Sequence, residues 1–154
     1  LEKIILKYVK ATIYIDYAHT PDALKITLIQ LRETLKERGN LKVLFGCGGN
    51  RDKGKRSLMG KYAASLADVV YITDDNPRYE NPKQIRDQIY ANCKNAIVIG
   101  NRKKAIREAI KKLDKNDILL IAGKGHEKHQ EVKGKRYFFD DREVVINLIK
   151  EMEV

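Results

Sequence analysis

Short apolar segments alternate with longer amphipathic segments along most of the chain, and this alternation constrains the fold more than any other feature. Five segments have the length and the β-branched content of strands: 12–15, 41–45, 69–72, 96–99 and 118–121. Between them, apolar residues recur every three or four positions, as on one face of a helix. The alternation predicts an α/β domain with a doubly wound, mostly parallel sheet and helices on both faces.

Turn and cap residues predict where several of these elements begin and end. Thr20–Pro21 and Asn81–Pro82 each combine an N-cap residue with a proline at the first helical position. Gly39 is suited to end the first of these two helices. An antiparallel hairpin near the C-terminus is predicted to turn at Gly134, and residues 4–9 are predicted to pair with the strand that follows them.

Length and composition favour a single domain. The chain has 154 residues, of which 43% are hydrophobic, enough for one core. No apolar run approaches the ~18 residues of a membrane-spanning helix, so we expect no membrane partner. Cys47 and Cys93 lie far apart and form no metal-binding spacing, which indicates a reducing cytoplasm. Because the chain does not begin with methionine, we expect it to be a piece of a longer protein.

The chain is basic, with 31 Lys and Arg against 21 Asp and Glu and a net charge of +10. Such a charge occurs both in nucleic-acid-binding proteins and in proteins that bind small anions. The most basic segment, 102–115, has its apolar residues at helical spacing, so its lysines are predicted to form a solvated outer face. No aromatic residues are interleaved with these charges, which disfavours a nucleic-acid-binding surface.

Four polar loops directly follow apolar strands: 16–20, 46–56, 73–78 and 122–127. In open α/β sheets, ligands bind at the carboxyl ends of the strands, where such loops converge. The shared position of the four loops therefore predicts a binding site at this edge of the sheet.

Two of these loops allow more than one interpretation. The glycines of 46–56 permit close approach of the backbone to an anion, or only a tight strand-to-helix turn. Neither a P-loop nor a dinucleotide-binding fingerprint occurs there. Asp74, Asp75 and Asn76 offer hard oxygen ligands for a metal ion, or they cap the next helix and pair with one another. The spacing of these three residues favours neither the metal site nor the helix cap.

The other polar residues of the loops also have a structural alternative. His19, between a strand end and a helix N-cap, contacts a ligand or folds back on its own loop. The glycines on either side of Lys124 suggest close approach of a ligand, and Glu127 is a ligand contact or a surface carboxylate. The planar fork of Arg78 suits a carboxylate.

Together, the four loops resemble the C-terminal domain of the Mur ligases, the ATP-dependent amino-acid ligases of peptidoglycan synthesis. The resemblance is carried in order and spacing by residues 16–22, 46–56, 75–78 and 122–127, and it extends over nearly the whole chain. The likeness is to the MurE type in particular, which adds diaminopimelate. It implies that residues 1–154 form one Rossmann-like domain, the third domain of a three-domain enzyme.

The resemblance also implies a reaction and its partners. The full enzymes use ATP to convert a carboxylate of a UDP-MurNAc-dipeptide into an acyl phosphate, which the amine of the added amino acid attacks. Their P-loop, modified lysine and most Mg²⁺ ligands lie in a central domain, and an N-terminal domain binds UDP. We therefore expect the present chain to contain no catalytic residue and no metal ligand, to close against its own central domain, and to have no ligase activity alone.

Residue by residue, the resemblance assigns an amino-acid site and a nucleotide-facing loop. The amino-acid site comprises Arg51, Asp75, Asn76, Pro77, Arg78, Gly123 and Glu127, and the residues that face the ribose and base are Asp16 and His19. Arg51 and Arg78 can each bind a carboxylate, while Asp75 and Glu127 can accept hydrogen bonds from ammonium groups. Such a set suits meso-diaminopimelate, which has two carboxylates and two amines.

Alternatives to this assignment differ in the added group or in the class of protein. Tyr79 and His129 depart from the usual residues of the family, which leaves the exact diamino acid open, and lanthionine would satisfy the same pattern. Ligases that add lysine, or that act on folate or a preassembled peptide, are disfavoured by Arg78 and by the complete motif at 123–127. A nucleic-acid-binding module is disfavoured by the carboxylates of the four loops, which would repel phosphates.

Overall fold

The computed structural model describes residues 1–153, which form one six-stranded sheet, one two-stranded sheet and five α-helices. In chain order the elements are β1 (Glu2–Leu6), β2 (Ala11–Asp16), α1 (Pro21–Thr34), β3 (Leu41–Phe45), α2 (Gly54–Leu66), β4 (Val69–Ile72), α3 (Pro82–Tyr90), β5 (Ile97–Val98), α4 (Arg102–Lys111), β6 (Ile118–Ala122), β7 (His129–Val132), β8 (Lys135–Phe138) and α5 (Asp141–Met152). The predicted alternation of strands and helices is confirmed, with β5 shorter than expected.

The six-stranded sheet has the order β1-β2-β6-β3-β4-β5, and every neighbouring pair is parallel except β1 with β2. β6 returns to the middle of the sheet, between β2 and β3, so the carboxyl ends of these three strands lie side by side. β3 and β6 are buried along their whole length, as expected for central strands covered on both faces. The predicted doubly wound, mostly parallel sheet is therefore confirmed.

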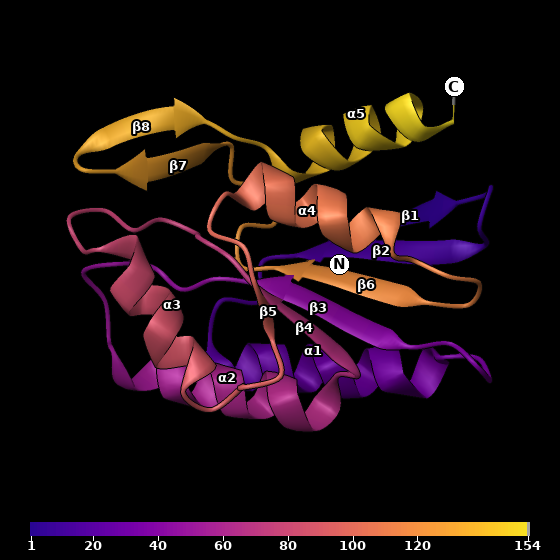
Figure 1. The fold of residues 1–154 in the computed structure, drawn as a ribbon, viewed down its shortest axis with the longest axis horizontal. Helices are drawn as coiled ribbons and strands as arrows, with labels where there is room; N and C mark the ends of the chain where they lie inside the picture. Colours follow the sequence, from indigo (N-terminus) through magenta and orange to yellow (C-terminus); the bar gives the residue numbers. More distant parts are fainter. Residues whose placement is uncertain (154) are drawn as a thin grey trace.

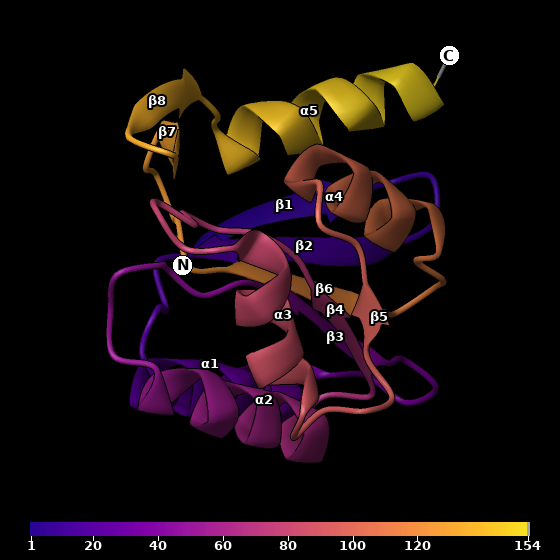
Figure 2. The ribbon, with the colours of Figure 1, turned by 60° about the vertical axis from the view of Figure 1, so that its left-hand side comes forward.

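Helices cover both faces of the sheet (Figure 1, Figure 2). α1, α2 and α3 pack on one face, where Leu28 and Met59 belong to the same hydrophobic cluster as Phe45. α4 and α5 pack on the other face, where Ile106 and Leu148 belong to a second cluster that includes strand residues of β2 and β6. The chain thus has a hydrophobic core on each side of its sheet.

The start of α1 is as predicted, but its end is not. Thr20 is the N-cap and Pro21 the first helical residue. The helix ends at Thr34 rather than near Gly39, because the next residue adopts an extended conformation. Gly39 instead lies against the backbone of Asn116, where any Cβ would overlap the carbonyl oxygen. This glycine permits a close contact between two loops and does not terminate the helix.

β7 and β8 form the predicted hairpin, which turns at Lys133 and Gly134, both with positive φ. The hairpin forms a sheet of its own beside the strand ends (Figure 1). A bridge joins it to Arg78, whose amide donates to the carbonyl of Glu131 at 3.0 Å and whose carbonyl accepts from the amide of Lys133 at 2.6 Å. The hairpin therefore holds the backbone of the β4–α3 loop in place.

The lysines of the basic helix α4 and of the residues after it are exposed, as predicted. Its apolar residues, such as Ile106 and Ile110, are buried as expected. Arg102, however, is only 2% exposed and does not belong to a solvated face. The first turn of α4 begins beneath the start of α5, where Asp141 supplies a buried carboxylate for the guanidinium. The other lysines and arginines of the segment are exposed or partly exposed.

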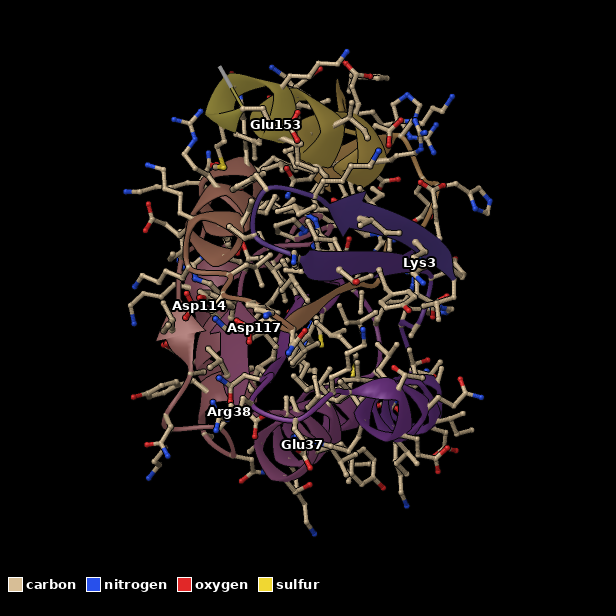
Figure 3. The ribbon with its side chains drawn as sticks, turned by 90° about the vertical axis from the view of Figure 1, so that its right-hand side faces the viewer. Lys3, Glu37, Arg38, Asp114, Asp117 and Glu153 are labelled. Carbon is tan, nitrogen blue, oxygen red and sulfur yellow. The ribbon has the colours of Figure 1, made fainter. Side chains whose placement is uncertain are left out.

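Different loops and turns lie at the two ends of the sheet. The carboxyl ends of the parallel strands lie at the same end of the molecule as the β7–β8 hairpin (Figure 1). The opposite end carries the turns around Arg38 and Asp114 (Figure 3). None of the helices within residues 1–153 is long and apolar enough to cross a membrane.

Candidate functional site

A cavity of about 350 Å³ opens at the carboxyl ends of the strands. The β2–α1, β3–α2, β4–α3 and β6–β7 loops all contribute to its wall, as their positions in the sequence led us to expect. Seven of the residues singled out from the sequence line it: His19, Arg51, Asp75, Asn76, Arg78, Gly123 and Glu127. The wall combines cationic and anionic side chains, which suits a ligand that carries both signs of charge.

Arg78 reaches the cavity from a constrained backbone. Its φ of 53° lies in the left-handed region, which residues other than glycine rarely adopt, and the bridge to β7 holds it there. Its Nη1 donates to the carbonyl of Gly49 at 2.9 Å, and its Nε lies 3.4 Å from a carboxylate oxygen of Glu131. Nη2 makes no hydrogen bond within residues 1–153. One side of the guanidinium is therefore held by the protein while the other is left for a ligand.

Arg51 and Glu127 are more exposed than Arg78 and less constrained. The Nη1 of Arg51 donates to the carbonyl of Asn50 at 3.1 Å. In the described part of the chain, neither Arg51 nor Glu127 forms an ion pair with another residue. Both charges are thus available to a bound molecule.

Asp74 and Asp75 are consecutive but have separate cationic partners. Asp74 Oδ1 lies 2.6 Å from the Nη1 of Arg86 on α3. Burial raises the pKa of Asp74, and the hydrogen bond and charge of Arg86 offset this only in part. Asp75 Oδ1 lies 3.2 Å from the Nζ of Lys124. The two carboxylates therefore do not pair with one another, and they do not cap α3, whose N-cap is Asn81. Within residues 1–153, no group of three or more His, Cys, Asp or Glu could hold a metal ion.

The glycine-rich β3–α2 loop packs directly against the β4–α3 loop. A Cβ at Gly49 would overlap the carbonyl oxygen of Pro77, and one at Gly46 would overlap that of Thr73. Pro77 consequently lies behind the wall of the cavity and does not line it. Close packing of the two loops accounts for these glycines, a reason that neither alternative drawn from the sequence had named.

The β2–α1 loop presents an aromatic pair at the cavity. The ring centroids of Tyr17 and His19 are 4.4 Å apart, and His19 Nδ1 lies 2.9 Å from the Tyr17 carbonyl oxygen. His19 thus folds back on its own loop and also lines the cavity. Asp16 borders a neighbouring cavity instead, and its Oδ2 accepts a hydrogen bond from the amide of Ala18 at 3.2 Å.

Cys47 also lines the cavity, although it is not among the residues that we assigned to the site individually. Burial is the main cause that raises its pKa, the charge of Asp75 adds to this, and together they bring it to about 12. The thiol is therefore protonated at neutral pH and is not an activated nucleophile. Tyr17, Asp52 and Lys55 line the cavity as well. All three belong to loops that the sequence analysis placed at the site, but no pattern within those loops distinguishes them from their neighbours.

Two buried arginines that the sequence did not mark as important connect the loops around the cavity. Arg56, 1% exposed, donates to the carbonyl of Gly48 at 2.9 Å and pairs with Glu80 at 2.9 Å. Arg102 donates to the carbonyl of Asp74 at 3.2 Å and to the last carbonyl of β6 at 3.3 Å. Each arginine therefore joins two of the four loops.

We expect Glu80 to stabilise the fold in a pH-dependent way. The hydrogen bond from Arg56 and that from the amide of Asn50 lower the pKa of Glu80 below its ordinary value of 4.5. A carboxyl whose pKa falls on folding stabilises the native state above its unfolded pKa and loses that contribution as the pH drops through the folded pKa. In urea unfolding, Glu80→Gln should be less stable than the unmodified chain at pH 7, and the difference should shrink as the pH is lowered through the folded pKa of Glu80. A difference in stability that does not shrink as the pH is lowered contradicts the assignment.

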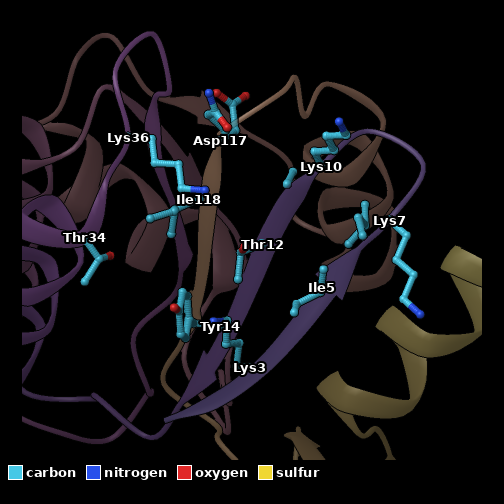
Figure 4. Close-up of a pocket in the computed structure, with 13 residues that line it drawn as sticks. Lys3, Ile5, Lys7, Lys10, Thr12, Tyr14, Thr34, Lys36, Asp117 and Ile118 are labelled. Carbon is cyan, nitrogen blue, oxygen red and sulfur yellow. The ribbon is translucent and has the colours of Figure 1, made fainter.

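A larger cavity of about 630 Å³ lies beside β1 and β2, toward the opposite end of the sheet (Figure 4). Its wall includes four lysines, Lys3, Lys7, Lys10 and Lys36. Its one carboxylate, Asp117, already lies 3.1 Å from the Nζ of Lys42. No residue that the sequence predicted for the site lines this cavity. The smaller cavity, with its mixed charges, is therefore the better candidate for a zwitterionic ligand.

Comparison with known proteins finds relatives that match most of the chain. The UDP-N-acetylmuramoyl-L-alanyl-D-glutamate–2,6-diaminopimelate ligase of Rickettsia bellii is 54% identical over 137 residues, which are 88% of this chain and 29% of that protein. A solved structure of a UDP-N-acetylmuramoyl-L-alanyl-D-glutamate–2,6-diaminopimelate ligase has a TM-score of 0.91 and 37% identity, and the match covers 99% of this chain and 32% of that one. Escherichia coli FolC in complex with ADP, at 16% identity, 92% and 29% coverage and a TM-score of 0.58, shares the fold.

These relatives are much longer than the present chain, which spans about a third of their length or less. The family model described as "Mur ligase, glutamate ligase domain" matches residues 3–125, most of the chain. The fold, the four loops and this match agree, and the chain therefore belongs to the Mur ligase family, of which it is a glutamate ligase domain.

Proposed function

We propose that this chain is the amino-acid-binding domain of an ATP-dependent ligase of peptidoglycan biosynthesis. The full-length enzyme joins 2,6-diaminopimelate to UDP-N-acetylmuramoyl-L-alanyl-D-glutamate, the reaction named for the relatives above. The observation that carries the proposal is the placement of two arginines and two carboxylates, Arg51, Arg78, Asp75 and Glu127, around one cavity of about 350 Å³.

The charges of the cavity match those of a diamino dicarboxylic acid. We place its carboxylates at Arg51 and at the free side of Arg78, because guanidinium groups form strong, charge-assisted hydrogen bonds with carboxylates. We place its amines toward Asp75 and Glu127, which can accept hydrogen bonds from ammonium groups. The role of the domain is then to bind and orient the diamino acid, so that one amine faces the activated carboxylate of the second substrate.

In this proposal ATP and Mg²⁺ are bound mainly by the central domain of the full-length protein. The chain lacks a P-loop, and its residues 1–153 offer no cluster of three metal-binding side chains, so they do not fit a complete Mg²⁺–phosphate site. We place the ribose and base of the nucleotide toward Asp16 and His19, where the Tyr17–His19 pair offers an aromatic surface. Because these substrates are nucleotides and nucleotide-linked precursors, we place the reaction in the cytoplasm.

Two other amino acids are alternatives for the added group. Lanthionine carries the same four charged groups as diaminopimelate and would use the same partners. Lysine lacks the distal carboxylate, so its binding would leave one guanidinium of the cavity without a partner, which is unfavourable.

The test is a ligation assay on the full-length protein with ATP, Mg²⁺ and UDP-N-acetylmuramoyl-L-alanyl-D-glutamate, supplied in turn with diaminopimelate, lanthionine and lysine. We expect kcat/KM for diaminopimelate or lanthionine to exceed that for lysine by at least roughly 100-fold, because a site built for a polar group rejects analogues that lack it. The isolated 154-residue chain, as control, should form no product. Absence of ligation by the full-length protein, or equal use of lysine, would refute the proposal.

A further inference from the structure

Lys124 lies sealed beneath the candidate site, between the two glycines of the β6–β7 loop. Its side chain is 0% exposed, whereas lysine is almost never fully buried unless it is paired. It does not line the cavity, so a bound molecule would not reach it directly. The neighbouring glycines suggested an approaching ligand, but the lysine itself turns inward.

The Lys124 ammonium contacts three groups from two other segments of the chain. Its Nζ donates to Asn76 Oδ1 at 3.1 Å and to the carbonyl of His129 at 2.7 Å, and it lies 3.2 Å from Asp75 Oδ1. Two of the three ammonium hydrogens are thus used in hydrogen bonds, and the Asp75 carboxylate beside the group balances its charge. Two of its partners, Asp75 and Asn76, line the cavity.

These contacts determine which atoms of Asn76 remain for a ligand. Its Oδ1 accepts hydrogen bonds from Lys124 and, at 2.9 Å, from the amide of Glu131, so both lone pairs of this oxygen are used. Its Nδ2 makes no hydrogen bond within residues 1–153. Asn76 is therefore fixed as a hydrogen-bond donor toward the cavity, a role that suits a ligand carboxylate.

Asp75, in contrast to Asn76, is left as a hydrogen-bond acceptor. Its Oδ1 is buried and lies near Lys124 in a geometry that forms no hydrogen bond, and its carboxylate accepts none from the rest of residues 1–153. Lys124 supplies the positive charge that balances this carboxylate inside the protein. Asp75 therefore remains an acceptor, a role that suits a ligand ammonium group.

We propose that Lys124 is a positioning residue of the amino-acid site. It holds Asn76 with its donor toward the carboxylate of the ligand, and it holds Asp75 in place as an acceptor for the amine. This inference rests on the proposed function, because it concerns the same cavity. Lys124 acts through these two side chains and makes no contact with the ligand itself.

Lys42 provides a matched control, because it forms a second buried Lys–Asp pair far from the cavity. Lys42 is 6% exposed, its Nζ lies 3.1 Å from Asp117 Oδ2, and it donates to the carbonyl of Lys112 at 2.7 Å. Lys42→Met and Lys124→Met each leave a buried carboxylate without its cation, so both should lower stability. Only Lys124→Met should also disturb the amino-acid site.

The experiment compares the full-length protein with its Lys124→Met and Lys42→Met variants in the ligation assay. We expect Lys124→Met to raise KM for diaminopimelate roughly tenfold, because small displacements of binding groups have large effects on a preorganised site, and to leave KM for ATP within about twofold. Lys42→Met should change neither constant. Lys124→Gln, which is neutral but keeps an amide donor, is a second variant in case Lys124→Met does not fold, and a smaller rise of the same KM is expected.

The possible outcomes separate this inference from the proposed function. If the unmodified protein ligates diaminopimelate and KM for diaminopimelate is unchanged in the folded Lys124 variants, only the positioning role is refuted. An equal rise of both KM values, or the same rise in Lys42→Met, also refutes it, since it indicates a general loss of structure. If the unmodified protein ligates no diamino acid, both proposals fall.

Discussion

Arg78→Ala in the full-length protein is expected to lower kcat/KM for diaminopimelate by roughly 10²- to 10³-fold while leaving the much weaker use of lysine almost unchanged. Removal of one partner of a hydrogen-bonded, desolvated charge pair costs about 2–5 kcal/mol, and each 1.4 kcal/mol corresponds to about tenfold. Lysine has no distal carboxylate, so the substitution removes no contact that lysine makes. The ratio of the two kcat/KM values should therefore collapse toward one.

The position of Arg78 explains why a single arginine has so large an effect. The hairpin bridge holds its backbone, and Gly49 and Glu131 hold one side of its guanidinium. The side left free is therefore preorganised, and little freedom is lost when a carboxylate binds. Arg78→Lys keeps the charge but not the planar fork, so we expect it to retain only part of the preference for diaminopimelate.

Arg136 is a matched control for Arg78. Its Nε lies 3.6 Å from the other carboxylate oxygen of Glu131, but its side chain is 69% exposed and does not line the 350 Å³ cavity. Arg136→Ala should leave the ratio of kcat/KM for diaminopimelate to that for lysine unchanged. An unchanged ratio in Arg78→Ala, with thermal unfolding that confirms a native fold, would refute the assignment of Arg78 to the distal carboxylate.

Much of the fold could be predicted because its signals are local. The alternation of apolar segments gave the strands and helices, and Thr20 and Pro21 marked a helix start that the structure reproduces. The four polar loops could be placed together because strands that run in the same direction end at the same side of a sheet. The role of Gly39 could not be predicted in this way, because it depends on Asn116, which belongs to a distant segment.

The buried charged residues could not be predicted for the same reason. Arg102 is of the same residue type as the surface cations of this basic chain, and the glycines beside Lys124 indicated a nearby ligand rather than a buried ammonium group. They are buried because partners from distant segments, Asp141 and Asp75, neutralise them. The sequence could therefore suggest which residues line the site, but it could not indicate which buried charges hold those residues in position.

Arg102→Met is expected to lower the free energy of unfolding by about 3–5 kcal/mol, the cost of leaving one member of a buried ion pair without its partner. Arg102 and Asp141 are both 0% exposed at their side chains, with Nε–Oδ1 and Nη2–Oδ2 distances of 2.8 and 2.7 Å. Burial alone would lower the pKa of Arg102, but the charge and hydrogen bonds of Asp141 raise it overall, so the guanidinium stays charged. Urea unfolding at pH 7 measures the effect.

Arg107→Met is the control for this prediction. Arg107 is also on α4 and also pairs with a carboxylate on α5, Glu151, at 3.6 Å, but the two side chains are 41% and 62% exposed. Exposed ion pairs contribute at most about 1 kcal/mol, so this variant should be nearly as stable as the unmodified chain. A similar loss in both variants would mean that the burial of Arg102 has no special role.

The double variant Arg102→Met/Asp141→Leu separates the charge of the pair from its connection to the site. Replacement of both buried charges by apolar side chains is often neutral, so much of the stability lost in Arg102→Met should return. Recovery should be incomplete, because Arg102 also donates to the carbonyls of Asp74 and Ala122, which would then lack these hydrogen bonds. These carbonyls belong to two of the loops around the cavity, so in the full-length protein the double variant should keep an elevated KM for diaminopimelate. Recovery of stability together with an unchanged KM would show that Arg102 stabilises the fold without ordering the site.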